Sequence, residues 1–480
     1  MRKVFGFGLG LAALIVFLAG VTGASGDRPA SSGGVPAYPL KKIVPSGFDV
    51  YQGILDWTPV SGTKAIAFAR NRVKGTKTFS LCSYSFSITG AGSAPRTIAA
   101  EKGIPRMAAC VWVADGASGE RAGKPYGLVF VDFEESFINY NSAVVYVAKF
   151  DSSGGLIGSW RPILKVTSPK GWGVICNNIL AFQRENSVGI VPSFWLMQSG
   201  QYRIKAQAHF LEVDIKDGIL IGAAKAIPLP NNGQYLEALS FAPAWNGTSW
   251  LVPLAVSFYK PYVARMEVLN NKLMVAVISG GSSHATVLKE IAADTVASQN
   301  TYEAVLAPYP GSAHDLALFV RHRTPVPEAQ RKLDMFRYDF SLKRLDVKGR
   351  IVKTTPVSIA APEHKLAYDP IYVFSSEWDN LSRAVAKNGT ILLSRARTLE
   401  IMRKGKWTDR QQEQEVDFYA VNILTGAVTH KARTVSVWKG VWWWRPLIAV
   451  FPAGPIAVVN CLYHTATPYP FDNYLTLFDD

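Results

Sequence analysis

The chain has 480 residues, of which 48% are hydrophobic and 18% charged, and its formal net charge is +15. A chain of this kind can bury a large core. Long heptads and 3.6-residue periods are absent from its body, which argues against a helical class, and frequent aromatic and β-branched residues favour strands. The charge predicts anionic surroundings or ligands and says nothing about the fold.

The N-terminal segment is predicted to direct export. Arg2 and Lys3 precede an uncharged apolar run over residues 4–21, and small or polar residues follow to 26. Residues 1–26 therefore resemble a secretory signal peptide, and an uncleaved membrane anchor is the alternative because the run approaches the length of a membrane span. We expect a soluble periplasmic or extracellular protein with a Pro/Gly/Ser linker over residues 27–37 and one domain over residues 38–480.

A strand–turn–strand unit repeats along the domain. Residues 146–163, YVAKFDSSGGLIGSWRPI, place an Asp-Ser-Ser-Gly-Gly turn between two apolar runs. Similar turns are predicted at residues 88–92, 214–218, 269–272, 339–343 and 422–426. Residues 474–480 form only the first half of a unit, and residues 38–44 supply its missing strand. Pairing these two ends closes a ring and removes exposed sheet edges.

The sequence thus predicts an all-β fold, a single β-propeller of about seven four-stranded blades, closed by the N-terminal strand pairing with the last blade. In the third blade the strands are expected at residues 179–182, 188–195, 206–213 and 219–226. Residues 282–300 fit no strand and are expected to form a loop with a helical turn. The blades are placed near residues 48–100, 105–168, 173–230, 235–300, 301–360, 366–437 and 441–480, the last completed by 38–45.

One hairpin carries a resemblance to known proteins. Residues 241–252, FAPAWNGTSWLV, resemble a hairpin of exported bacterial β-propeller proteins that form an uncharacterised group. The resemblance implies fold and export and no activity. Asn246 and Asn388 each begin an Asn-Gly-Thr glycosylation pattern, but both are interpreted as hairpin turns.

A basic rim is predicted between the second and third strands of the fifth and sixth blades, because these connections open on one face of a propeller. Guanidinium groups there suit carboxylate, sulfate or phosphate groups, and the tryptophan suits a sugar face. Interspersed acidic residues favour the alternative of a merely solvated loop. The rim residues are Arg321, Arg323, Arg331, Lys332, Arg395, Arg397, Arg403, Lys404, Lys406 and Trp407.

The leading functional interpretation is a non-enzymatic recognition or scaffold protein of the cell envelope or extracellular space. Its basic rim would bind an anionic glycan, an envelope polymer or an acidic protein, and export argues against a physiological nucleic-acid partner. A third class, a structural or assembly component, would use blade edges or the Trp-rich residues 438–445 as its interface.

Catalysis is the alternative interpretation. The histidines show no metal-ligand spacing, no nucleophile elbow or phosphate loop is present, and no cofactor or metal is predicted. His314, Asp315 and His322 are assigned a structural or surface role. A glycan-active hydrolase or lyase would instead use carboxylates lining a central funnel, and the candidates at or just before innermost strands are Asp56, Glu237 and Asp369.

Two of the four cysteines are candidates for a disulfide. Cys110 and Cys176 both fall near the start of an innermost strand in neighbouring units, and export would permit oxidation. The alternative is that they are buried small hydrophobic residues. Cys82 and Cys461 receive no assignment.

Overall fold

The structure is a computed structural model, and all the residues it describes belong to one compact unit, Val35–Asp480. The predicted signal peptide and linker lie outside the described residues. No helix in the described part of the chain has the length and apolarity needed to cross a membrane. The described residues are 41–43, 53–72, 79–89, 92–99, 103–113, 125–134, 141–198, 204–230, 235–260, 267–280, 286–294, 301–325, 336–359, 372–377, 385–387, 389–402, 410–438, 441–451, 456–464 and 471–478.

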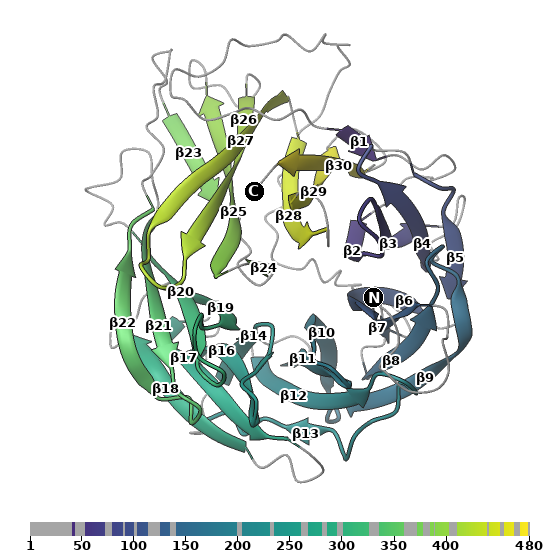
Figure 1. The fold of residues 1–480 in the computed structure, drawn as a ribbon, viewed down its shortest axis with the longest axis horizontal. Helices are drawn as coiled ribbons and strands as arrows, with labels where there is room; N and C mark the ends of the chain where they lie inside the picture. Colours follow the sequence, from purple (N-terminus) through teal and green to yellow (C-terminus); the bar gives the residue numbers. More distant parts are fainter. Residues whose placement is uncertain are drawn as a thin grey trace, which may run out of the picture. The chain divides into compact units, whose positions relative to one another are not determined.

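The described strands form six hydrogen-bonded sheets, most of them four-stranded and antiparallel (Figure 1). The first contains β2 (Gly53–Pro59), β3 (Lys64–Arg72), β4 (Phe79–Ser87) and β5 (Arg96–Ala99). The second contains β6 (Ile104–Val113), β7 (Tyr126–Glu134), β8 (Ser142–Phe150) and β9 (Leu156–Thr167). In each sheet the strands follow chain order from one edge to the other.

The third sheet joins two antiparallel sets. Its path runs through β10 (Trp172–Gln183), β11 (Ser187–Gln198), β12 (Ile204–Asp214), β14 (Tyr235–Ser240), β16 (Ser249–Lys260), β17 (Glu267–Ser279) and β18 (Thr286–Asp294), with β13 (Lys225–Ala226) and β15 (Ala244–Trp245) beside it. The two sets meet where Lys205 of β12 pairs in parallel with Leu236 of β14. Because of this junction, the predicted number of about seven blades stays a prediction.

The remaining sheets come from the second half of the chain. One contains β19 (Thr301–Pro308), β20 (Leu316–Pro325), β21 (Phe336–Leu345) and β22 (Ile351–Val357). The next contains β23 (Tyr372–Glu377), β25 (Thr390–Met402), β26 (Arg410–Asn422) and β27 (Val428–Trp438), with β24 (Val385–Lys387) paired to β25. The last contains β28 (Val441–Val450), β29 (Ile456–His464), β30 (Phe471–Phe478) and β1 (Lys41–Ile43).

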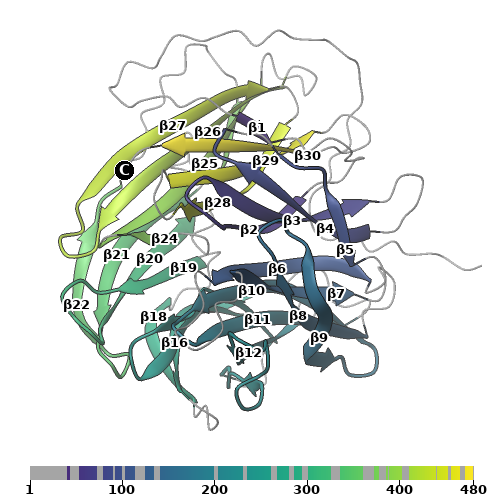
Figure 2. The same cartoon turned by 45° about the vertical axis from the view of Figure 1, so that its right-hand side comes forward.

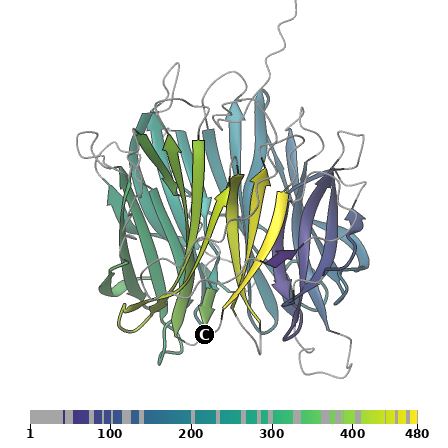
Figure 3. The same ribbon diagram turned by 90° about the horizontal axis from the view of Figure 1, so that it is seen from above.

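The predicted all-β propeller is confirmed. Innermost strands β2, β6 and β10 contact one another in chain order, and β28 of the last sheet contacts β2 of the first (Figures 1 and 2). Seen from above, the strands of successive sheets stand side by side (Figure 3). The closing pair is also confirmed, since β1 runs antiparallel to β30 with Lys42 opposite Tyr474. Of the predicted closing strand over residues 38–44, the described residues are 41–43, and they form β1.

Strand β3 shows why the sequence favours this fold. Its residues Ala65, Ala67 and Ala69 pack into one core cluster with Phe451, which follows β28 in the last sheet, whereas Ile66 and Phe68 pack with residues of the second sheet. Alternate side chains of a strand point to opposite faces, so a run that is apolar at every position buries both faces. Each sheet can therefore pack between two others.

The repeated turn is an Asx turn. Asp151 Oδ1 accepts hydrogen bonds from the backbone N–H groups of Ser153 and Gly155 at 2.8 and 2.9 Å. Partial burial opposes the effect, but these hydrogen bonds hold the pKa of Asp151 below its usual value. At the tip of a hairpin the backbone N–H groups have no partner strand, and the side-chain oxygen accepts their hydrogen bonds instead. This explains why an Asp or Asn occupies this position.

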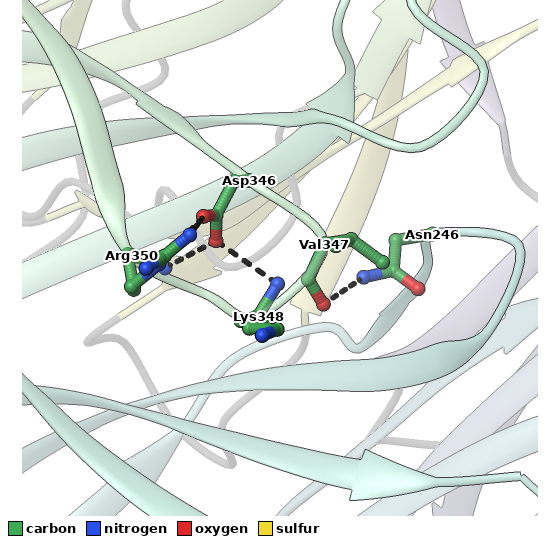
Figure 4. Close-up of polar contacts among 5 residues, drawn as sticks. All are labelled: Asn246, Asp346, Val347, Lys348 and Arg350. Carbon is green, nitrogen blue, oxygen red and sulfur yellow. Dashed lines mark hydrogen bonds and ion pairs between the residues drawn. The ribbon is translucent and has the colours of Figure 1, made fainter.

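The same turn recurs at Asp214, Asp346 and Asn422, whose Oδ1 atoms accept two backbone N–H groups each. Figure 4 shows Asp346 with its turn, and beside it Asn246, whose Nδ2 donates to the carbonyl oxygen of Val347 at 2.9 Å. Asn246 is buried and opens the predicted hairpin turn. Asn388 lies outside the described residues.

Three local predictions are wrong. Residues 269–272 lie within β17, and residues 339–343 lie within β21, whose turn comes later at residues 346–350. Phe336, Tyr338, Phe340 and Leu342 alternate along β21, and this period-2 apolar pattern outweighs the polar residues between them. Residues 282–300 contain β18, an outer strand in which no residue is fully buried, so it lacks the alternation of buried apolar and exposed polar residues that marks a strand.

Bulges on innermost strands link neighbouring sheets. The register of β2 shifts next to Asp56, and Asp56 Oδ2 accepts a hydrogen bond of 2.8 Å from the backbone N–H of Cys110 on β6. The register of β10 shifts before Asn178, and Asn178 Nδ2 donates at 3.0 Å to the carbonyl oxygen of Ser240 on β14. A bulge redirects a side chain, and here it turns Asp56 toward the next sheet and Asn178 toward the second strand set of the third sheet.

The predicted disulfide is absent, because Cys110 and Cys176 are both thiols. They do lie on innermost strands of neighbouring sheets, β6 and β10, as the sequence predicted. However, Cys176 packs in the core between the second and third sheets, whereas Cys110 packs against the core that faces the first sheet. The alternative interpretation of buried hydrophobic cysteines is therefore preferred.

Replacing Asp56 tests the link between the first two sheets. We expect Asp56→Ala to lower the free energy of unfolding by about 1–3 kcal/mol, because the N–H of Cys110 loses its acceptor in a buried place. Urea unfolding measures this change. The control is Thr58→Ala on the same strand, whose hydroxyl donates to the carbonyl oxygen of the neighbouring Pro59 and has no other hydrogen-bond partner among the described residues; it should cost less than about 1 kcal/mol. Equal losses of unfolding free energy in the two variants would show that Asp56 has no special role in linking the first two sheets.

His209 on β12 should make stability fall in acid. Burial lowers the pKa of His209 to about 4, and its Nδ1 has no hydrogen-bond partner among the described residues. The unfolded chain binds a proton near pH 6.5 while the folded chain does not, so stability falls from there to about pH 4, by up to roughly 3 kcal/mol. Chemical unfolding at pH 7 and pH 4 should show a smaller fall for His209→Phe than for the parent or for His314→Gln.

Candidate functional site

The candidate site lies where β18, β19 and β20 come together at one end of their sheets. Asp294 is the last residue of β18, and Tyr302 is the second residue of β19. His322 on β20 lies directly opposite Tyr302 in the antiparallel register. The three side chains thus come from two sheets and from three successive strands of the chain. We call them the Asp294 cluster.

Hydrogen bonds hold the Asp294 cluster together. The hydroxyl of Tyr302 donates to Asp294 Oδ1 at 2.9 Å, and His322 Nε2 lies 3.0 Å from Asp294 Oδ2. The rings of Tyr302 and His322 stack with centroids 4.5 Å apart and an interplanar angle of 12°. One carboxylate therefore orients both a phenol and an imidazole.

The surroundings of the Asp294 cluster are half-buried. Tyr302 belongs to the core between the third and fourth sheets, together with Ala304 and Leu306 on alternate positions of β19. The side chains of His322 and Asp294 keep 22% and 14% of their surface exposed, so part of the cluster meets solvent. Burial, and secondarily Asp294, raises the pKa of Tyr302 above its usual range. The phenol therefore stays protonated at neutral pH.

An ionisable imidazole and a protonated phenol give this site acid–base capacity. An ionised carboxylate only accepts hydrogen bonds, so His322 presents its Nε2–H to Asp294 and its Nδ1 keeps the lone pair in the neutral ring. That nitrogen is suited to accept a proton from a substrate or water. The Tyr302 hydroxyl is suited to supply one. The site thus holds the two groups that acid–base catalysis requires.

The other face of the same strands carries an ion pair. Arg321 Nη2 lies 2.5 Å from Glu303 Oε1, and the two residues are opposite each other on β20 and β19. The Arg321 guanidinium also lies over the ring of Tyr338, 5.1 Å from its centroid. Arg321 is only 4% exposed. It is therefore part of the core between sheets.

This placement corrects the predicted basic rim. Arg321 and Arg323 lie within β20 and not in the connection that follows it, and Arg395 and Arg397 lie within β25. In the register of β25 with β26, the last two face Asp417 and Glu415, so cationic positions are matched by acidic ones. The remaining rim residues lie outside the described residues: Arg331, Lys332, Arg403, Lys404, Lys406 and Trp407.

The predicted funnel carboxylates are only partly placed. Asp56 lies on innermost strand β2, is buried and accepts the hydrogen bond from Cys110 described above. Glu237 lies on innermost strand β14, but its side chain is outside the described part, as is the whole of Asp369. The pairing of funnel carboxylates stays a prediction. Among the described residues, no group of His, Cys, Asp and Glu side chains could hold a metal ion.

Sequence reasoning missed most of the Asp294 cluster. Asp294 falls in the segment interpreted as a loop, and Tyr302 was not singled out. His322 was noted, but only as a structural or surface residue beside His314, which instead bonds to the carbonyl oxygen of Asn246. The signal was the pairing of β19 with β20, since that register places Tyr302 and His322 together.

Comparison with known proteins gives a likeness of fold only. An α-L-arabinanase of Penicillium chrysogenum complexed with arabinobiose is 8% identical, with a TM-score of 0.39 over 93% of this chain and 99% of that one. A GH93 α-L-arabinofuranosidase of Fusarium graminearum with arabinobiose is 9% identical, with a TM-score of 0.39 over 92% and 98%. The NanB sialidase of Streptococcus pneumoniae, as its K499G mutant, is 13% identical, with a TM-score of 0.34 over 92% and 70%. No protein-family model and no curated protein matches the chain.

The leading functional interpretation of the sequence, a non-enzymatic protein that binds through a basic rim, is wrong. The structures of similar fold are those of glycoside hydrolases and a sialidase. Physically, the described rim residues lie in strands, and Arg321 is buried in an ion pair that leaves it no role at a solvated surface.

Removing Arg321 distinguishes a buried ion pair from a solvated rim. We expect Arg321→Ala to lower the free energy of unfolding by roughly 3 kcal/mol, because the half-buried Glu303 carboxylate loses its ion pair. Arg350→Ala is the matched control: that side chain is 66% exposed and pairs with Asp346, so its loss should cost less than about 1 kcal/mol. Urea unfolding of both variants gives the comparison. Similarly small losses of unfolding free energy in both variants would show that solvent screens the ion pair of Arg321 with Glu303.

Proposed function

We propose that this protein is a glycan-active hydrolase or lyase. The observation that carries the proposal is the hydrogen bonding of Tyr302 and His322 to one carboxylate, Asp294, at a partly exposed end of the propeller strands. Cleavage of a glycosidic bond needs one group that takes up a proton and another that delivers one to the leaving oxygen. His322 and Tyr302 have these roles in the proposal.

Each residue has a separate task. Asp294 fixes the tautomer and orientation of His322 and stabilises the imidazolium that forms when Nδ1 takes up a proton. Tyr302 delivers its proton to the glycosidic oxygen as the C–O bond breaks. Its raised pKa keeps the proton in place until that step and makes the phenolate a transient species.

The proton from His322 then returns the phenolate to a phenol, directly or through water. In hydrolysis, His322 takes the proton from a water molecule whose oxygen bonds to the anomeric carbon. In elimination, it takes the proton from the carbon beside a uronate carboxylate, and the electron pair forms a carbon–carbon double bond as the glycosidic oxygen leaves. Both routes use the same acid and base. They differ in the proton that His322 takes and in the product.

A glycan panel and three variants test the proposal. Residues 27–480 would be incubated with neutral, sialylated and uronate-containing oligosaccharides, and new reducing ends and unsaturated products would be measured. For a cleaved glycan we expect His322→Gln and Tyr302→Phe to lower kcat by about 10²–10⁴-fold, since each removes one proton-transfer group. We expect Asp294→Asn to lower kcat as well, because Asp294 fixes the orientation and tautomer of the His322 imidazole.

The control is His314→Gln, which removes a histidine of the same sheet outside the cluster and should keep kcat within about twofold. Thermal unfolding of each variant separates loss of chemistry from loss of fold. Cleavage that persists in both His322→Gln and Tyr302→Phe would reject the cluster as the catalytic site. Failure of the parent to cleave any glycan of the panel would reject the proposed function.

A further inference from the structure

We propose that a groove between the second and third sheets binds a short acidic peptide segment that also carries branched apolar side chains. The groove has a volume of about 460 Å³, within the usual range for ligand sites, and it is lined by residues of β8, β9 and the turn after β12. None of these elements contributes to the Asp294 cluster. The inference is independent of the proposed chemistry.

A bulge in β9 opens the groove. In the register of β8 with β9, Val147 lies opposite Arg161 and Lys149 opposite Ile157, so residues 158–160 of β9 face Ala148 alone. Gly158 has a φ of +82°, and a side chain there would meet no atom within 4 Å. Bulges often reshape a strand beside a binding site. Here the bulge leaves a stretch of backbone beside an open space.

Two cations, Lys149 and Arg161, and one carboxylate residue, Asp217, line the groove, so its lining has a net positive charge. The Nζ of Lys149 donates to the carbonyl oxygen of Lys216, and Arg161 Nη1 donates to that of Asp217 at 3.4 Å. Neither side chain forms an ion pair with a carboxylate in the described part of the chain. A carbonyl oxygen accepts a hydrogen bond from each cation but carries no net charge, so it does not neutralise the positive charge of the side chain. An incoming carboxylate would therefore gain charge-assisted hydrogen bonds from both residues.

Exposed apolar side chains decide between a peptide and a sugar. Ile157 and Ile219 are 45% and 50% exposed, and both line the groove, whose floor includes Leu128 and Val147. Glycans usually pack on aromatic faces, and the described lining has none. Branched aliphatic residues instead suit a leucine or isoleucine side chain. Charge and apolar lining together favour an acidic, apolar peptide.

The geometry also fits an extended peptide. Residues 156–161 belong to β9, which is the last strand of its sheet. A segment lying along an outer strand can place alternate side chains on one side. Acidic side chains would then face Lys149 and Arg161 while apolar ones lie between Ile157 and Ile219.

Fluorescence anisotropy with labelled peptides tests this inference. The probe is a short peptide alternating glutamate and leucine, and it is compared with counterparts in which leucine becomes serine or glutamate becomes lysine. We expect the first peptide to bind and each counterpart to bind at least about tenfold more weakly. Unlabelled oligogalacturonate serves as the anionic glycan competitor and should fail to displace the probe.

Variants of exposed residues locate the binding. Arg161→Glu reverses one charge and Ile219→Ser removes one apolar contact. Each should lower the affinity for the probe peptide by about tenfold or more. Lys170→Glu makes the same charge change in an exposed turn outside the groove and should leave binding within about twofold. Unchanged binding in both groove variants, displacement by oligogalacturonate, or no binding of the probe to the parent would each overturn the proposal.

Discussion

Burial of both faces of each sheet is the constraint on which this structure depends. Strand β3 shows it most clearly, since its alanines pack toward the last sheet while Ile66 and Phe68 pack toward the second. Phe68 meets Phe150 of the second sheet edge-on, with ring centroids 4.9 Å apart. A sheet with two apolar faces is stable only between two neighbours, and a ring of sheets supplies two neighbours to every member. The pairing of β1 with β30 completes that ring.

Polar groups inside this arrangement must find partners across the interfaces. Asp56 and Asn178 do so from bulges on innermost strands: Asp56 reaches the backbone of the next sheet, and Asn178 reaches the backbone of the second strand set in the third sheet. Arg321 and Glu303 instead form an ion pair with each other on neighbouring strands of one sheet. A buried charge or polar group without a partner costs several kcal/mol, so such residues mark positions where the interface is specific. Arg321, a basic residue of the fourth sheet, therefore contributes to packing where a rim was expected.

The Asp294 cluster has a different character because it keeps part of its surface in solvent. Its carboxylate comes from an outer strand of one sheet, and its phenol and imidazole come from the first two strands of the next. An interface between sheets can thus assemble acid–base groups that no local motif brings together. The groove at β9 is built differently. There, a bulge in a single sheet opens space beside exposed isoleucines and cations.

By itself, the sequence determined the fold class, the ring closure and the Asx turns at Asp151, Asp214 and Asn422. These features follow from local chemistry: alternation of apolar residues, a carboxylate or amide at a turn tip, and a half-unit at each end. Only the tertiary structure decided that Cys110 and Cys176 pack in different cores, that Arg321 is buried, and that Asp294, Tyr302 and His322 meet. The physical reason is strand register. A shift of one residue sends every side chain of a strand to the opposite face, and no pattern of charge along the chain specifies that choice.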